Sequence, residues 1–551
     1  MGGGVAMEGL MMGTQLLISS LIRNADRNHG TTEIVTRTVE GPLHRYTYRD
    51  AHRRSRQLAN ALGSLGIKPG DRCATLAWNT YRHFEIYYAV SGMGAVCHTV
   101  NPRLFAPQIS FILNHASDRC IFADLTFVPL LEEMADELEH VEAIVIMTDD
   151  KHMPRTSLPN VHCYESLING HSDDYDWPEF DENTASSLCY TSGTTGDPKG
   201  VLYSHRSSLI HAFRSGLPDC FNLSARDAVL PVVPMFHVNA WGLPYVSAMV
   251  GCKIVFPGPA MDGASLQELI ENEKVTFSAG VPTIWLSLLQ YLEESGKNIQ
   301  TLKRVVIGGS ATPRSMTARF AEKHGAEVLH AWGMTEMSPI GTVNHPKYGM
   351  EDETPDQIYD RQIKQGREVF GAEMKIVDDD DRTLPNDGKA FGTLKVRGPS
   401  VCRAYYKEQR SDAHDENGWF ATGDVATIDP DGYMHVTDRS KDVIKSGGEW
   451  ISSIELENIA VGHPDVAEAA SIGVHHPKWD ERPLLLVVPR NGCDLTREDM
   501  LEYFNGKVAK WWIPDDVVFV EELPHTATGK LLKIKLREDF RDHVLPTAHQ
   551  S

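Results

Sequence analysis

The segment Tyr190–Gly200 has the composition of a loop that binds phosphate. Its sequence, YTSGTTGDPKG, contains seven Gly, Ser or Thr residues and one lysine, Lys199. Glycines allow backbone amides to turn toward an anion, hydroxyl groups add donors, and a lysine adds positive charge. The spacing G-x-x-G-x-x-K-G differs from the Walker A loop, in which four residues separate the glycines and Lys-Ser/Thr follows at once. Taken alone, this composition is equally typical of a flexible surface loop.

Two further segments carry residues that could do chemistry. His237 is a lone histidine among apolar residues such as Phe236 and Val238, and this setting favours a core histidine over a ligand. The four aspartates at 378–381 could offer oxygen ligands to calcium, but the EF-hand spacing counted from Gly388 places Thr383 at the first ligand position. We therefore predict a solvent-exposed turn at these aspartates.

The elements around these segments alternate between helix and strand. Apolar residues at helical spacing precede short apolar runs, first at 130–138 and 143–147 and again at 266–270 and 275–277. A buried strand at 305–307 leads into Gly308-Gly309, and a helix around 316–320 and a strand at 328–329 follow. Strand, helix and strand at these lengths predict βαβ units and a largely parallel sheet.

The pattern changes after residue 370. Residues 374–377 and 392–396 predict a hairpin around the acidic turn, and a helix-and-strand region begins near residue 443. The polar segment 437–442 separates the two parts, and we place the main domain boundary there.

Composition excludes several classes of protein. The chain has 551 residues, so two or more domains are expected, and its formal charge of −22 argues against nucleic acid or an anionic membrane as the main partner. Nine scattered cysteines are typical of reduced thiols, which predicts a cytoplasmic protein. No run approaches the ~20 apolar residues of a membrane span, and the first residues lack the basic region of a signal peptide.

Five motifs in order resolve the ambiguity of the phosphate loop. They are the loop itself, AWGMTE at 331–336, TGD at 422–424, DRSKD at 438–442 and TGK at 528–530. Together they closely resemble the motif series of the AMP-forming acyl-CoA synthetases, in the superfamily that includes luciferase and peptide adenylation domains. The resemblance runs from about Leu17 to Asp539. The branch it resembles most holds medium-chain fatty acyl-CoA ligases and methylmercaptopropionate–CoA ligases.

The resemblance assigns the ATP site. The loop implies contacts to the β- and γ-phosphates, Glu336 matches the magnesium ligand together with Thr191, and Trp332 stands where most members carry a tyrosine that packs on adenine. Asp424 matches the ribose-binding aspartate, since one carboxylate can accept hydrogen bonds from both ribose hydroxyls. The implied ATP-binding residues are Thr191, Ser192, Gly193, Thr194, Thr195, Lys199, Ser310, Ala311, Thr312, Trp332, Gly333, Met334, Thr335, Glu336, Asp424, Arg439 and Lys530.

The resemblance also assigns the acyl site and the C-terminal elements. His237, Glu336 and Lys530 are the implied catalytic residues, and Lys530 would bridge the carboxylate and the α-phosphate as charge builds between them. The acyl site would be formed by His237, Val238, Asn239, Trp241, Gly308, Gly309 and Trp332. The loop of the CoA step would comprise Lys445, Ser446, Gly447, Gly448, Glu449 and Trp450, with Lys441 as the hinge residue.

These assignments imply an α/β fold and an activity. The expected fold has a large N-terminal domain (1–438) with mainly parallel sheets flanked by helices and a β-rich subdomain, a hinge (439–442) and a small mobile α+β lid domain (443–551). The implied enzyme joins a carboxylic acid to CoA with MgATP through an acyl-adenylate. Its acid would be a medium-chain fatty acid, a methylthio-alkanoate or an arylalkanoate, and a homodimer is common in this branch. The alternatives are an acyl-AMP ligase that serves a carrier protein and a catalytically silent binding protein.

Overall fold

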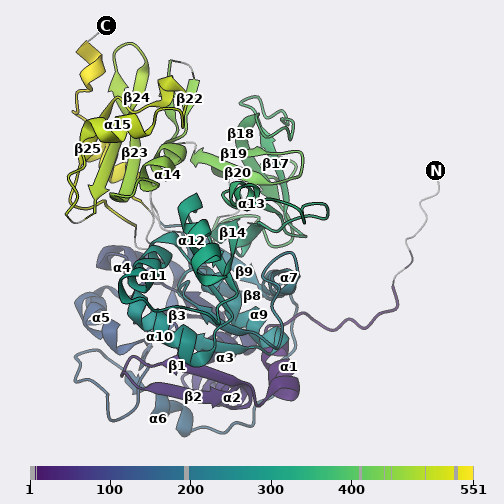
Figure 1. Ribbon diagram of the computed structural model, residues 1–551. Helices are drawn as coiled ribbons and strands as arrows, with labels where there is room; N and C mark the ends of the chain where they lie inside the picture. Colours follow the sequence, from purple (N-terminus) through teal and green to yellow (C-terminus); the bar gives the residue numbers. More distant parts are fainter. Residues whose placement is uncertain are drawn as a thin grey trace.

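The computed structural model describes residues 7, 9–191, 198–408, 412–439, 441–447, 449–490, 492–526 and 531–549. A large N-terminal part holds two mostly parallel sheets, an antiparallel β-subdomain lies to one side, and a C-terminal domain lies above the large part (Figure 1). This is the mixed α/β architecture that the sequence predicts. No helix among the residues described is both long and apolar enough to cross a bilayer.

The two large sheets position the site. The first has seven strands in the order β7 (Val161–Cys163), β6 (Ala143–Ile146), β5 (Asp118–Ala123), β3 (Arg72–Leu76), β4 (Val96–Thr99), β8 (Ala185–Tyr190) and β9 (Gly200–Ser204). The second has nine, in the order β16 (Arg367–Glu368), β15 (Ile340–Val343), β14 (Glu327–Gly333), β13 (Arg304–Ile307), β12 (Phe277–Gly280), β10 (Ala228–Pro231), β11 (Lys253–Phe256), β1 (Glu33–Arg37) and β2 (Leu43–Thr47). Helices cover both, so their central strands are buried along almost their whole length.

The helices of the large part connect and cover these strands. They are α1 (Ser19–His29), α2 (Tyr48–Ser64), α3 (Tyr81–Gly92), α4 (Ala106–Ala116), α5 (Val128–Met134), α6 (Tyr164–Asn169), α7 (His205–Gly216), α8 (Val238–Trp241), α9 (Leu243–Val250), α10 (Gly263–Glu273), α11 (Pro282–Ser295), α12 (Arg314–His324) and α13 (Pro355–Gln362). Helix α3 is buried along its whole length, and it packs between elements of both sheets.

Most of the predicted elements are confirmed, with one shift. Helix α5 precedes β6, and β13, α12 and β14 follow one another as expected. The strand expected at 275–277 instead begins at Phe277. Lys274 adopts a left-handed conformation at the end of α10, and the N–H of Val275 donates back to the carbonyl of Ile270. Val275 therefore completes the end of the helix, and its apolar side chain packs without belonging to a strand.

The β-subdomain contains the predicted hairpin. Its sheet is antiparallel, in the order β17 (Glu373–Val377), β18 (Phe391–Arg397), β19 (Phe420–Ile428) and β20 (Met434–Arg439). The carboxylate of Asp378 accepts hydrogen bonds from the N–H groups of Asp380 and Arg382, so the acidic segment forms a turn. No cluster of metal-ligating side chains occurs in the part of the chain that the structure describes.

The C-terminal domain is a small α+β unit. Its sheet contains β22 (Glu449–Ile451), β21 (Ile444–Ser446), β24 (Asp480–Pro489) and β23 (Val466–His476), and β25 (Asp516–Phe519) also pairs with β24. Its helices are α14 (Ser453–Val461), α15 (Arg497–Tyr503) and α16 (Lys533–Asp539). Helix α14 packs on β23 and also contacts β20, so this domain meets the β-subdomain beside the boundary predicted at 439–442.

Candidate active site

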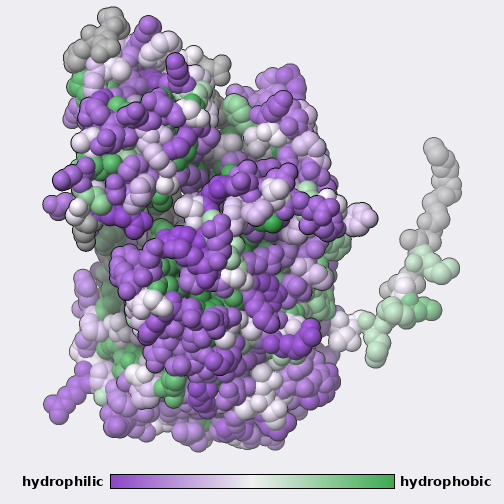
Figure 2. Space-filling view, viewed as in Figure 1, coloured by the Kyte–Doolittle hydropathy of each residue, from purple (hydrophilic) through white to green (hydrophobic). Residues whose placement is uncertain are grey.

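A cavity of about 1180 Å³ lies between the large part and the C-terminal domain. The surface is hollowed between the two in the space-filling view (Figure 2). Its lower wall is formed where β10, β12, β13 and β14 end, and these parallel strands share one edge of the nine-stranded sheet. The carboxyl ends of parallel strands are where α/β sheets bind ligands.

The described ends of the phosphate loop meet at this cavity. The N–H of Thr191 donates to the carbonyl of Lys199 (2.9 Å), and the N–H of Lys199 donates to the hydroxyl of Thr191 (3.2 Å). The ammonium of Lys199 lies 4.7 Å from the ring centre of Tyr405. Both loop ends line the cavity. Ser192, Gly193, Thr194 and Thr195 lie outside the described residues.

Glu336 offers a buried carboxylate to the same cavity. Glu336 lies in the short turn after β14 and is 6% exposed. Its Oε1 accepts a hydrogen bond from the hydroxyl of Tyr405 (2.8 Å). Burial, helped by the charge of Glu336, raises the pKa of Tyr405 well above its usual range, so Tyr405 stays a donor. One carboxylate and the hydroxyl of Thr191, which lines the same cavity, fit a Mg²⁺ ion that takes its other ligands from phosphates and water.

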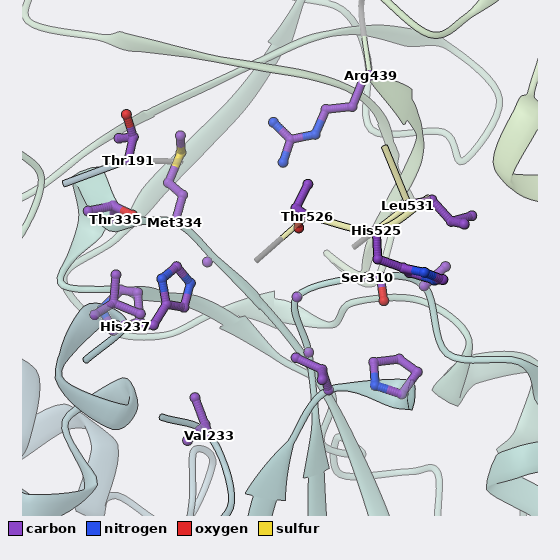
Figure 3. Close-up of a pocket in the computed structure, with 18 of the residues that line it drawn as sticks. Thr191, Val233, His237, Ser310, Met334, Thr335, Arg439, His525, Thr526 and Leu531 are labelled. Carbon is purple, nitrogen blue, oxygen red and sulfur yellow. The ribbon is translucent and has the colours of Figure 1, made fainter. Parts of the chain in front are cut away.

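The predicted adenine segment is divided between the cavity and the core. Ser310, Ala311, Gly333, Met334 and Thr335 line the cavity. Figure 3 shows Thr191, Met334 and Thr335 on one side with His237 below them, and Arg439, Thr526 and His525 across the open space. Thr312 is buried behind this wall and does not line it.

Trp332 and Asp424 form a buried pair beside the cavity. The indole Nε1 of Trp332 donates to Oδ2 of Asp424 (2.9 Å), and Oδ1 of Asp424 pairs with Nε of Arg439 (2.7 Å). Asp424 and Arg439 face each other across β19 and β20, which explains the pairing. Trp332 packs against Gly341 and does not line the cavity. The structure therefore brings only Arg439 of these three to the cavity.

The predicted acyl site surrounds the turn after His237. His237, Val238, Trp241, Gly308 and Gly309 line the cavity. A Cβ on Gly308 would lie 3.1 Å from the indole of Trp241 and 2.8 Å from the carbonyl oxygen of Ala331, so only glycine fits between them.

Asn239 is the exception in this segment. It lies behind the wall, where its side chain bonds to β8, so the structure does not bring it to the acyl group.

The C-terminal domain contributes one face of the cavity. Lys441, His525, Thr526, Leu531 and Lys533 line it. Lys445, Ser446 and Gly447 lie on the β21 hairpin away from the cavity, where the N–H of Gly447 donates to the carbonyl of Trp479 (2.7 Å). Glu449 and Trp450 continue this hairpin in β22. Gly448 and Lys530 lie outside the described residues, although the chain on both sides of 527–530 borders the cavity.

Sequence reasoning missed two groups of lining residues. Tyr405 holds Glu336, and the aromatic residue in a loop gave no signal for this role. A group of apolar lining residues was also missed, and it comprises Val232, Val233, Met261, Val281, Ile284 and Leu286. These residues follow β10, β11 and β12, so the rule that ligands bind at the carboxyl ends of parallel strands could have found them.

Comparisons with known proteins agree with this architecture. A model of the AMP-binding enzyme family matches residues 21–406, and a model of the AMP-binding enzyme C-terminal domain matches residues 455–530. The medium-chain-fatty-acid–CoA ligase of Ectopseudomonas oleovorans is 52% identical over 539 residues, covering 98% of both chains. The 3-methylmercaptopropionyl-CoA ligase of Ruegeria lacuscaerulensis is 53% identical over 536 residues, covering 97% of this chain and 99% of the relative.

A solved structure gives the same result. The anthranilate CoA ligase in complex with anthranoyl-AMP superposes with a TM-score of 0.86 at 25% identity, covering 97% of this chain and 99% of that chain. The chain belongs to the AMP-binding enzyme family. It is an AMP-forming acyl-CoA ligase, a class that uses ATP with Mg²⁺ and takes CoA as co-substrate.

Proposed function

We propose that this ligase activates a short- to medium-chain fatty acid or a methylthio-alkanoate such as 3-methylmercaptopropionate. The observation that carries the proposal is the shape of the cavity. His237 lies between Thr191 and Thr335 on one side and Val233 on the other (Figure 3), and Trp241 lines the same cavity. The indole of Trp241 packs against Gly308, so a bulky ring limits the space for the acyl chain. Relatives named for medium-chain fatty acids and 3-methylmercaptopropionate support the same range.

The residues divide the first step between them. Thr191, Lys199 and the loop between them would hold the β- and γ-phosphates, and His237 would lie beside the reacting carboxylate. Lys530 would bridge the carboxylate and the α-phosphate as negative charge develops. Glu336 and Thr191 would hold Mg²⁺, which when bound neutralises charge on the triphosphate. Ser310, Ala311, Gly333 and Met334 would line the adenine pocket, with Thr312 and Trp332 supporting it from behind.

Two assignments need a change of conformation. Asp424 would bind ribose once Arg439, which is 42% exposed and pairs with Asp424, turns toward the nucleotide. The segment Lys445–Trp450 would line a thiol tunnel once the C-terminal domain rotates about Lys441. Residues 1–438 would then act as the adenylating body and 443–551 as the lid, so one site could run both steps in turn.

Thioester formation across a panel of acids tests the proposal. Straight-chain acids from propionate to laurate, 3-methylmercaptopropionate and an arylalkanoate would each be assayed for AMP release with and without CoA. CoA-dependent release with the highest kcat/KM for a short- or medium-chain acid or the methylthio acid is expected. Acyl-AMP accumulation without thioester would indicate a ligase that serves a carrier protein. Absence of both products with every acid would indicate a silent binding protein.

We also propose that the enzyme is a cytoplasmic homodimer. All nine cysteines are free thiols, which fits a reducing compartment. Phe213 and Leu217 at the end of α7 are more than 40% exposed and could bury apolar surface against a second copy. Light scattering coupled to size exclusion would give the oligomeric state, and a monomer at micromolar concentration would contradict the dimer.

A further inference from the structure

The segment after His237 is one turn of left-handed helix. Val238, Asn239, Ala240, Trp241 and Gly242 have φ angles of 42°, 53°, 49°, 54° and 76°. The ψ angles of Asn239 and Ala240 are 41° and 44°. This conformation is unfavourable for L-residues and least favourable for β-branched ones such as Val238, so it persists only where surrounding contacts impose it.

Backbone hydrogen bonds close the turn but do not choose its hand. The N–H of His237 donates to the carbonyl of Pro234 (3.0 Å), and the N–H of Gly242 donates to that of Asn239 (3.0 Å). Gly242 packs closely against His211, and a Cβ there would lie 2.6 Å from the imidazole Nδ1. The end of the turn is therefore fixed by packing, while its centre needs another anchor.

Asn239 supplies this anchor to β8. Its side chain is 3% exposed, and its Nδ2 donates to the hydroxyl of Ser187 (3.0 Å). Its Oδ1 accepts from the thiol of Cys189 (3.6 Å), which also contacts the hydroxyl of Thr99 (3.2 Å). Burial raises the pKa of Cys189 to about 11, so the thiol remains a donor. Asparagine is also among the L-residues that tolerate this conformation best.

The anchor joins the two ends of the cavity. Strand β8 ends at Tyr190, and Thr191 follows it at the start of the phosphate loop. The anchored turn follows His237 and includes Trp241. Both residues line the acyl side of the cavity. In the described part of the chain, the side-chain hydrogen bonds of Asn239 connect this turn to β8, and the backbone N–H groups of Val238 and Asn239 also reach the thiol of Cys189.

We propose that Asn239 is a positioning residue of the adenylation step. It holds the left-handed turn against β8 and so fixes His237 and Trp241 relative to the bound triphosphate. This inference rests on the proposed function, because it assumes that the acid binds beside His237. Asn239 acts through these residues and makes no contact with the substrates.

Three variants distinguish the effect of losing the Asn239 hydrogen bonds from the effect of a more flexible turn. Asn239→Gly keeps the tolerance for positive φ but removes both side-chain hydrogen bonds. Ser187→Ala removes the acceptor on β8 and leaves the turn sequence intact. Ala240→Gly is the matched control, because it loosens the turn in the same way and keeps the anchor.

The kinetic result should be a split between the two substrates. In Asn239→Gly we expect kcat/KM for the acid in pyrophosphate exchange to fall at least tenfold, while the Kd for ATP changes less than threefold. Ser187→Ala should also lower kcat/KM for the acid while the Kd for ATP stays within threefold. Ala240→Gly should leave both kcat/KM for the acid and the Kd for ATP within threefold. Equal losses for acid and ATP would indicate a structural role and overturn the proposal, as would an Ala240→Gly defect as large as that of Asn239→Gly.

Crystal structures of Asn239→Gly and Ser187→Ala provide a readout that needs no activity. The indole of Trp241 should leave Gly308 in Asn239→Gly, and an unchanged turn in both variants would overturn the proposal. If the wild type formed no thioester with any acid, the proposed function would fail, and these structures would still decide whether Asn239 holds the turn. Should Asn239→Gly fail to fold, Ser187→Ala carries the same test.

Discussion

The two walls of the cavity are built in different ways. The wall from the large domain is formed by side chains at strand ends that are buried and held from behind, as Glu336 is by Tyr405 and the turn of Trp241 is by Asn239. The opposite side includes Arg439, at the end of the β-subdomain, which is 42% exposed and pairs with Asp424. A wall that must present charge in fixed geometry benefits from preorganisation, whereas a wall that must move needs contacts that can be exchanged.

The junction between the walls is a small buried polar cluster. Ser453 donates to Asp438 from both its N–H and its hydroxyl (2.7 Å each), and Nζ of Lys533 donates to the same hydroxyl (2.6 Å). Lys533 also pairs with Glu457 (2.7 Å). Asp438 ends the β-subdomain just before the hinge, and the other residues belong to the C-terminal domain. The hydroxyl of Ser452 also donates to the carbonyl of Thr437, and α14 packs on β20, so this cluster is part of the contact between the two parts.

The largest effect should come from the wall that we propose moves between the two steps. In Lys530→Ala we expect acyl-AMP formation to fall on the order of 10²–10³-fold, because a preorganised cation at developing charge is lost. Thioester formation from supplied acyl-AMP should be largely intact, since the lid then turns the lysine away. The control is Lys535→Ala, an exposed lysine paired with Asp539 on the same segment, which should alter neither step. Equal damage to both half-reactions would show that this wall does not divide its work.

The reverse result is expected for Gly448→Leu. A side chain there should block the thiol tunnel, so pyrophosphate exchange should survive while CoA-dependent turnover falls by about 10²-fold or more. The neighbouring Gly447 has a φ of 61°, and a Cβ on it would lie 2.7 Å from the ring of Trp479, so the loop already has little spare room. If both activities fell together, the loop would be a structural element and not part of the second step.

Within the wall of the large domain, the sequence predicts some elements and not others. The β13–α12–β14 unit could be predicted from its apolar runs, and the resemblance assigned the lining residues Gly308, Ser310 and Met334. Sequence motifs also identified Glu336. The left-handed turn could not be predicted, since Val238 and Trp241 have low intrinsic preference for positive φ and only tertiary contacts impose it. The resemblance places Asn239 in the acyl site, but the left-handed turn directs its side chain to Ser187 on β8.

A second gap has the same origin. Trp332 and Asp424 are 92 residues apart, and their hydrogen bond follows from packing between the β-subdomain and β14. Motif spacing along the chain carries no information on which of several buried polar groups pair with one another. The sequence therefore located the residues of the site more reliably than their contacts.

The rigid wall should control which acid is used. If the indole of Trp241 forms the floor of the acyl pocket, Trp241→Ala should shift kcat/KM toward longer chains. Each accommodated methylene contributes roughly 0.8 kcal/mol when fully desolvated, so two or three added carbons should change the profile measurably. A panel from propionate to laurate would be run on both proteins. If the ring is a side wall, every acid should weaken without a change in rank order, and the floor hypothesis would be wrong.

The smallest effect should come from the junction, as a dependence of stability on pH. Burial raises the pKa of Glu457 to about 7, although Lys533 opposes the shift, and burial likewise raises the pKa of Asp438. A carboxyl group with a raised pKa in the folded state stabilises that state while it is protonated, and its contribution is lost as pH rises through the folded pKa. Two carboxylates then face a single lysine. The C-terminal domain should accordingly lose roughly 1–3 kcal/mol between about pH 5 and pH 8.

Glu457→Gln tests this loss of stability directly, because the amide stays neutral at every pH. The negative charge of Asp438 is then matched by the positive charge of Lys533. The Tm of the wild type should fall more steeply than that of Glu457→Gln as pH rises from 5 to 8. The exposed Glu521 offers a control, since Glu521→Gln should follow the wild-type profile. Parallel profiles for wild type and Glu457→Gln would mean that Lys533 keeps Glu457 ionised throughout. The junction would then be a permanent ion pair that contributes equally at every pH, and the ease of separating the two walls would not depend on protonation.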